Sequence, residues 1–299
     1  MTAFRATACL TAALLAGATL GAAPSPPQTP PVSLELLLRA AGGYVDRYEQ
    51  RLVGIVAEEE YQQAVLPAMG TRSQTGGGTL SRNTHAYLLT VNLGTLGWAT
   101  FRDVFELDGR AVRGREERLT RLLQNITPDS LEQARRIAAE SARYNLSPVS
   151  GRFERTLNVP LAALMYLRSS NQARSVFRLG KTDRIGDTLC ATLQFSERAR
   201  PRLIGTPDEA PAQGTFWIDP SSGGRVVKTE LRIETANSPA QFVRSQVTVS
   251  YAPADKIDAW LPTVMDEVYE IVSAAQLVTG HAVYSGFREF TVTTSEAVK

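Results

Sequence analysis

Residues 213–234 constrain the fold most, because their side chains alternate between apolar and charged with a period of two. Two sets alternate after a turn at 219–224: an apolar set of Val227, Thr229, Leu231 and Ile233, and a charged set of Lys228, Glu230, Arg232 and Glu234. This pattern predicts a strand with one face in the core and one in water. The turn sequence Asp-Pro-Ser-Ser-Gly-Gly favours a hairpin with 215–218 as the partner strand. A sheet is therefore the centre of the predicted fold.

Other stretches that are rich in apolar and β-branched residues predict further strands. They are 51–63, 85–93 and 98–107 in the first half, and 175–179, 188–195, 242–251, 264–272 and 281–293 in the second half. Asp108 and Gly109 predict a tight turn after the third of them. No helical stretch separates successive strands in the second half, which favours an antiparallel sheet.

A short charged stretch at 115–123 and three longer stretches predict helices. Ser33 can cap the first of these three, 34–48, in which apolar residues recur at three- and four-residue steps. The second, 131–144, has an apolar side of mostly small residues. Asn158 can cap the third, 159–167, whose residues are apolar nearly all round. This third helix is either an ordinary part of the core or the lining of an apolar cavity, and both interpretations stay open.

The first residues predict export. Arg5 is followed by the apolar run 6–20 and by Gly-Ala-Ala at 21–23, which together resemble a signal peptide of residues 1–23. The run is too short and too rich in small residues to predict a membrane-spanning helix. We therefore expect a periplasmic or secreted protein with no integral membrane segment after signal cleavage.

The rest of the chain is expected to form a proline-rich linker at 24–32 and a single domain at 33–299, with a helical insertion at about 115–168. The formal net charge of +2 is close to neutral, which argues against nucleic acid as a partner. Cys190 is the one cysteine left after signal cleavage, so no internal disulfide is expected.

No catalytic or metal-binding motif is evident. The two histidines and the remaining cysteine, His85, His281 and Cys190, are far apart in sequence, so no zinc site is expected. No Gly-x-Ser-x-Gly elbow or dinucleotide-binding fingerprint occurs. The three glutamates at 58–60 could include a catalytic carboxylate, but a solvated strand edge is the preferred interpretation. We expect no enzyme activity and no cofactor.

Four local features of the second half resemble the LolA-like lipoprotein-carrier fold. They are the hairpin at 216–227, the sequence Trp-Leu-Pro-Thr-Val-Met at 260–265, Glu267 with Tyr269, and the closing segment 284–290. The resemblance implies an α+β fold: one large curved antiparallel sheet, a half-barrel, with helices packed on its concave face. Residues 33–299 would then be a single LolA-like domain. The chain is also similar to uncharacterised secreted proteins of acidobacteria.

The resemblance implies a non-catalytic carrier for an apolar, lipid-like ligand, with a lipid or a lipoprotein as partner. The expected ligand-binding residues lie on the apolar helix: Val159, Leu161, Leu164, Met165 and Leu167. The alternative is a cell-envelope scaffold of the same fold, with a filled core and a protein partner. A continuous, empty apolar lining of the concave face would favour the ligand, whereas interdigitated side chains would favour the scaffold.

The signal-peptide hypothesis predicts a mature protein that begins within a few residues of Pro24 and carries no acyl group. Measuring the intact mass of the protein purified from its native host tests this. A retained N-terminus or a lipid adduct on Cys9 would contradict the prediction.

Overall fold

The computed structural model describes residues 33–67, 79–92, 98–116, 131–147, 155, 157–236, 242–254 and 257–289. Residues Val32–Lys299 form one compact unit. The predicted signal peptide, the predicted linker and part of the predicted insertion lie outside the described residues.

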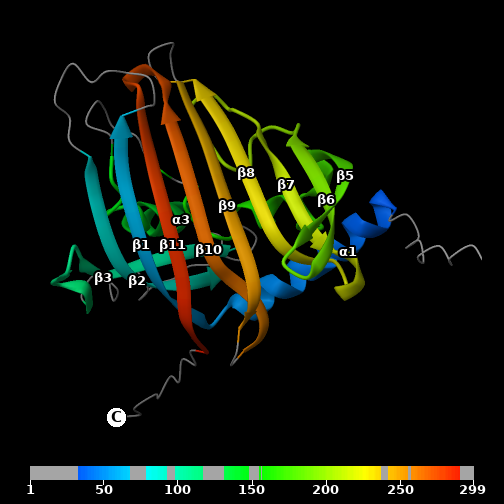
Figure 1. The fold of residues 1–299 in the computed structure, drawn as a ribbon, viewed down its shortest axis with the longest axis horizontal. Coiled ribbons are helices and arrows are strands. Elements are labelled where there is room, and N and C mark those ends of the chain that lie inside the picture. Colours follow the sequence, from blue (N-terminus) through cyan, green and yellow to red (C-terminus); the bar gives the residue numbers. More distant parts are fainter. Residues whose placement is uncertain are drawn as a thin grey trace, which may run out of the picture. The chain divides into compact units, whose positions relative to one another are not determined.

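A single antiparallel sheet dominates the described part of the chain (Figure 1). Its strands are β1 Ile55–Pro67, β2 Leu80–Asn92, β3 Trp98–Leu107, β4 Arg110–Ala111, β5 Ser175–Ile185, β6 Thr188–Glu197, β7 Ala212–Asp219, β8 Arg225–Ala236, β9 Phe242–Ala254, β10 Ile257–Ile271 and β11 Gln276–Glu289. Their order across the sheet is β4-β3-β2-β1-β11-β10-β9-β8-β7-β6-β5. The sheet is open, with β4 at one end and β5 at the other. The antiparallel prediction is confirmed.

The two halves of the sheet join where β1 pairs with β11. Ile55 lies opposite Glu289 at one end of this pairing, and Pro67 lies opposite Gln276 at the other. Every other pair of neighbouring strands in the described sheet is consecutive in the chain. The sheet is thus two meanders that meet at the first and last described strands.

The predicted hairpin is confirmed, and its two faces follow the prediction from Lys228 to Glu234. The partner strand β7 is longer than the predicted 215–218, and a bulge in the pairing brings Val226, in place of the predicted Val227, into the main core cluster. Strands β7 and β8 pair with Gly214 opposite Leu231. On β8, Leu231 and Ile233 are each 1% exposed, whereas Arg232 is exposed. Lys228 lies on the outer face, with its ammonium 4.9 Å from the centre of the Trp217 ring.

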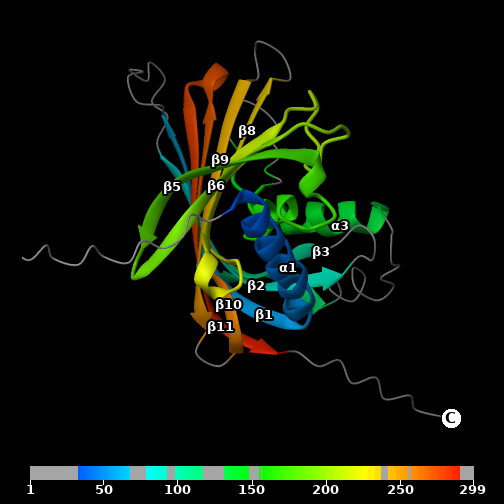
Figure 2. The ribbon, with the colours of Figure 1, turned by 90° about the vertical axis from the view of Figure 1, so that its right-hand side faces the viewer.

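The described helices are α1 Leu34–Leu52 and α3 Leu131–Ser141, and the 3₁₀ helices are η2 Ala162–Tyr166, η3 Gln172–Arg174, η4 Pro220–Ser222 and η5 Val272–Ala274. Seen from the side, the sheet bends around α1 and α3, which lie on the same side of it (Figure 2). That concave side holds the main core, and the predicted α+β fold with a curved sheet and helices on its concave face is confirmed.

Helix α1 buries one stripe and packs closely on its neighbours. Its buried positions are Leu37, Ala41, Gly42, Val45, Tyr48 and Leu52. A β-carbon on Gly42 would lie 2.5 Å from Gln172 Nε2 and 3.3 Å from the Leu167 carbonyl oxygen. The nearest atoms are the ends of flexible side chains, but the carbonyl oxygen belongs to another segment that crosses α1 at this point. Gly42 thus lets that segment approach α1 closely, and a larger residue would require it to shift.

Helix α3 covers the outer edge of β3. Its residue Ile137 packs against Phe101, and both side chains are fully buried. The backbone amide of Arg102 donates a hydrogen bond to Ser141 Oγ at 3.1 Å. The helix thereby supplies an acceptor to a strand edge that the two-residue β4 leaves uncovered.

The face assignment of the hairpin predicts different costs for two substitutions on β8. Leu231→Asp places an uncompensated charge in the dry layer and should lower the free energy of unfolding by several kcal/mol. Lys228→Asp on the outer face removes a cation–π contact and a favourable interaction with the exposed Asp183 carboxylate, and should cost far less than Leu231→Asp. Urea denaturation of both variants measures the difference, and equal losses would contradict the assignment.

Candidate functional site

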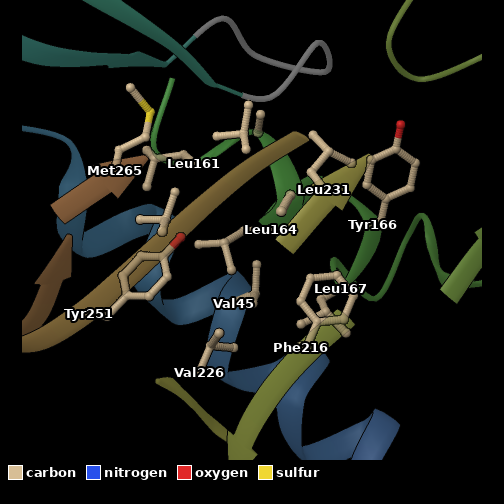
Figure 3. Close-up of a cluster of buried hydrophobic side chains, with 14 of the residues drawn as sticks. Val45, Leu161, Leu164, Tyr166, Leu167, Phe216, Val226, Leu231, Tyr251 and Met265 are labelled. Atoms are coloured by element: carbon tan, nitrogen blue, oxygen red, sulfur yellow. The ribbon is translucent and has the colours of Figure 1, made fainter. Parts of the chain in front are cut away.

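The concave face of the sheet is covered by residues 157–174, here called the cover segment. It contains η2 and η3, separated and flanked by irregular chain. Leu161, Leu164 and Leu167 are at most 2% exposed and belong to the main core cluster. Figure 3 shows them packed among side chains of α1 and of the sheet, such as Val45 and Leu231. The apolar layer between the cover segment and the sheet is filled by interdigitated side chains.

The predicted α-helix at 159–167 is wrong, because the chain forms only the five-residue 3₁₀ helix η2 there. A run as short as this one is marginal as an α-helix by itself. Its backbone follows instead from packing on both sides. Asn158 does not act as the predicted cap, because η2 begins at Ala162 with Leu161 at its N-cap position. The Asn158 carbonyl oxygen accepts a hydrogen bond from Arg102 Nη2 at 2.9 Å.

The five predicted ligand-binding residues all lie on the cover segment. Three of them are the buried leucines, and Val159 and Met165 are half-buried. Val159 also packs against the main core cluster. None of the five lines the cavity of about 780 Å³ that opens beside α1. The described structure brings the five residues together on one short segment, and their role in binding stays a prediction.

Two buried ion pairs lie at the start of the cover segment. Arg155 Nη1 is 2.9 Å from Glu267 Oε1, and both side chains are 0% exposed. Arg102 pairs with Glu59, through Nη2 to Oε1 at 2.8 Å, and this pair is at most 2% exposed. Fully buried pairs of this kind have lost nearly all of their hydration, so they depend on further hydrogen bonds.

Those further bonds come from three neighbours, which with Arg155 and Glu267 form the buried polar cluster: Tyr61, Gln63 and Tyr269. The Tyr269 hydroxyl donates to Glu267 Oε2 at 2.6 Å. Tyr61 donates to Glu267 Oε1, and Arg155 donates to Gln63 Oε1. Burial raises the pKa of both tyrosines well above the ordinary value, so their hydroxyls stay protonated and act as donors.

Gly280 makes room for the buried carboxylate. It lies opposite Glu267 in the β10–β11 pairing. A β-carbon at this position would lie within 2.8 Å of three Glu267 side-chain atoms. Its backbone is extended and needs no glycine for conformational reasons, so the requirement is one of space alone.

The glutamates at 58–60 divide as the strand period predicts, with Glu59 on one face and Glu58 and Glu60 on the other. Glu59 is 1% exposed, however, and β1 lies in the middle of the sheet. The predicted solvated edge is therefore wrong for Glu59. Glu58 is exposed and pairs with Arg288 at 2.9 Å. The sequence around Glu59 gives no sign of its buried partner, which comes from a different strand.

Groups able to perform catalysis are sparse in the described structure. Burial raises the pKa of the Cys190 thiol to about 11, and its side chain is fully buried, so it is a poor nucleophile at neutral pH. His281 Nδ1 lies 2.7 Å from Asp266 Oδ1 on the outer face. Ser81 lines the same shallow hollow of about 400 Å³, but no hydrogen bond joins it to His281. Among the residues described, no group of three or more His, Cys, Asp or Glu could hold a metal ion.

Comparisons with known structures give similarities of low identity. No family model matches the chain, and no curated protein matches it. A DUF1329 family protein from Desulfovibrio piger is 13% identical, with a TM-score of 0.40, over 87% of this chain and 95% of that one. A domain from Vibrio parahaemolyticus, named for outer membrane lipoprotein sorting, is 11% identical, with a TM-score of 0.38, over 85% and 94%.

Lipovitellin is 9% identical, with a TM-score of 0.28, over 83% of this chain and 27% of that one. These similarities lend no support to the expected likeness to acidobacterial proteins, which stays a prediction. Among the described residues, no helix is both long and apolar enough to cross a membrane.

The buried pair predicts a large penalty for removing one partner. Arg155→Met leaves Glu267 buried without its cation and should cost about 3–5 kcal/mol of unfolding free energy. The double variant with Glu267→Gln should lose less than the sum of the two single variants, because they share one interaction. Arg244→Met breaks an exposed pair with Glu270 and serves as the matched control, with an expected cost below about 1 kcal/mol. Equal losses at Arg155 and Arg244 in chemical denaturation would refute this description.

Proposed function

We propose that the protein is a non-catalytic carrier for an apolar, lipid-like ligand, exported to the periplasm or secreted. The observation that carries the proposal is the cover segment: an apolar piece of chain without a regular α-helix lies over the concave apolar face of an open sheet. A carrier needs such an apolar face, together with a cover whose side chains can be displaced by the apolar groups of the ligand.

The attachment of the cover segment supports this proposal. Its hydrogen bonds and ion pairs with the rest of the described chain lie at 158–160 and at 168–174, where Arg168 pairs with Glu49 of α1 at 3.0 Å. At the start, Asn158 and Pro160 accept from Arg102 and from the Tyr251 hydroxyl, respectively. At the end, Gln172 Nε2 donates to the Leu38 carbonyl of α1 at 2.9 Å. The leucines between these ends are held by apolar contacts, and an acyl chain offers the same kind of contact.

In the proposed mechanism the ligand takes the place of cover-segment side chains above the sheet. The acyl chain of the ligand would take the positions of three leucine side chains, Leu161, Leu164 and Leu167. Its sides would contact Val159 and Met165. Burial of acyl methylenes contributes about 0.8 kcal/mol each, which gives affinity without any specific polar group. The proposal therefore requires no metal, nucleophile or cofactor.

A scaffold of the cell envelope is the second candidate function. The observation that favours it is the filled apolar layer, in which Leu164 and Leu231 are each 1% exposed (Figure 3). Interdigitated side chains are the arrangement expected of a scaffold, so the carrier function requires that the ligand displace them. A scaffold would keep this layer closed and present an outer surface to a protein partner.

Uptake of a fluorescent fatty-acid probe distinguishes the two functions. The folded wild type should bind the probe, and Met165→Asp should weaken binding about tenfold, which corresponds to losing contact with about two methylenes. Val268→Asp is the matched control, because Val268 is 43% exposed on the outer face of β10 and should leave uptake unchanged. Leu164→Asp should reduce uptake further, with circular dichroism used to exclude unfolding.

Mass spectrometry of lipids extracted from the natively purified protein completes this test. Co-purified lipid together with probe uptake would support the carrier. A folded wild type that binds no probe and releases no lipid would contradict it and favour the scaffold.

A further inference from the structure

A cavity of about 780 Å³ opens where the second half of α1 faces the connected ends of β9 and β10. This volume lies within the range typical of small-molecule sites. The lining residues combine cationic, aromatic and apolar side chains: Tyr44, Arg47, Tyr48, Arg51, Arg225, Pro253, Ala254, Ile257, Asp258, Ala259 and Trp260. None of them belongs to the cover segment.

The charge of the lining favours an anion, since three arginines stand against one aspartate. Arg47 is exposed and has no ion pair among the described residues. Arg51 Nη2 is 3.8 Å from Glu289 Oε1, a long contact that leaves most of its donors available. Arg225 pairs with Asp219 at 2.5 Å and stacks over Trp260, with its guanidinium 4.0 Å from the ring centre.

Two buried donors at the cavity have no hydrogen-bond partner in the described part of the chain. They are the hydroxyl of Tyr48 and Nε of Arg225. Tyr48 is 5% exposed, and an unsatisfied buried polar group of this kind costs free energy. Its neighbour Tyr44 stacks on it with ring centres 5.7 Å apart. Burial raises the pKa of Tyr44 to about 12, so its hydroxyl also remains a donor at neutral pH.

The cavity is joined to the apolar layer under the cover segment. Tyr48 and Ile257 line the cavity and also belong to the main core cluster. Tyr48 contacts the edge of the Tyr251 ring, with centres 6.5 Å apart, and the Tyr251 hydroxyl donates to the Pro160 carbonyl at 2.8 Å. Tyr251 therefore contacts both the cavity-lining Tyr48 and the cover segment.

We infer that this cavity binds the anionic head group of a single-chain amphiphile, a carboxylate or a phosphate, while the acyl chain runs toward the core. The arginines supply charge-assisted hydrogen bonds to the anionic oxygens, and the unpartnered Tyr48 hydroxyl gains an acceptor. Trp260 and the apolar residues Ala254 and Ile257, from the ends of β9 and β10, contact the first methylenes. This inference rests on the proposed carrier function and names the chemical class of its ligand.

Displacement of the bound fluorescent fatty acid tests the inference, with dodecyl phosphate and the neutral dodecyl maltoside as competitors below their micelle-forming concentrations. Dodecyl phosphate should displace the probe at a concentration at least about tenfold lower, because only it meets the arginines. Inorganic phosphate at the same concentration should displace none of the probe, because the dodecyl chain supplies most of the affinity of dodecyl phosphate.

Three variants assign the effect to residues. Arg47→Glu should remove most of the preference for dodecyl phosphate, since it reverses an exposed charge without breaking an ion pair. Arg178→Glu, an exposed arginine on β5 that does not line the cavity, is the charge-matched control and should keep the preference. Tyr48→Phe removes an unpartnered hydroxyl, so it should keep the fold and weaken dodecyl phosphate binding about threefold to tenfold.

The possible failures are distinguishable. Equal displacement by the two amphiphiles, or an unchanged preference in Arg47→Glu, would overturn the head-group site and leave the carrier function intact. Displacement of the probe by inorganic phosphate alone would identify a site for a free anion and overturn the inference that the ligand is an amphiphile. A wild type that takes up no probe of any charge would overturn the carrier function and this inference together.

Discussion

An open sheet with one apolar face must have that face covered, and this requirement organises the rest of the molecule. The alternation along β8 places Leu231 and Ile233 on the concave side, where water has to be excluded. Helix α1 covers part of that side and the cover segment covers more of it. Because the sheet does not close into a barrel, the covering elements come from outside it. The cover segment is thus held to the sheet mainly by side-chain contacts, whereas neighbouring strands are joined by backbone hydrogen bonds.

The buried polar cluster gives this cover a defined position. Apolar contacts alone tolerate sliding, because one leucine can replace another at small cost. A buried guanidinium has no such freedom, because leaving Arg155 or Glu267 unpaired is costly. Arg155 therefore fixes where the cover segment starts, and Gly280 leaves the space that this arrangement needs. We interpret the cluster as a source of specificity more than of net stability.

The sequence predicts the sheet well, because strand period and turn residues are local properties. The faces of the 213–234 hairpin and the turn at Asp108 and Gly109 follow from neighbouring residues alone. The buried pairs do not, since Arg155 and Glu267 are 112 residues apart and each resembles a surface residue in its local sequence. The cavity beside α1 could not be predicted from the sequence either, because its lining residues come from four elements, α1, β8, β9 and β10. The apolar run at 159–167 shows a further limit: composition indicates burial but not backbone type.

The pairing of β1 with β11 also bears on the order of folding. These strands lie at opposite ends of the described domain, and Ile55 must find Glu289 before the centre of the sheet exists. Closing so long a loop is slow, and until then both strands carry unpaired edges. The meander of β1 to β3 cannot reach its final packing on a partly synthesised chain. This topology would suit the proposed export, because the centre of the sheet forms only once the last strand is available.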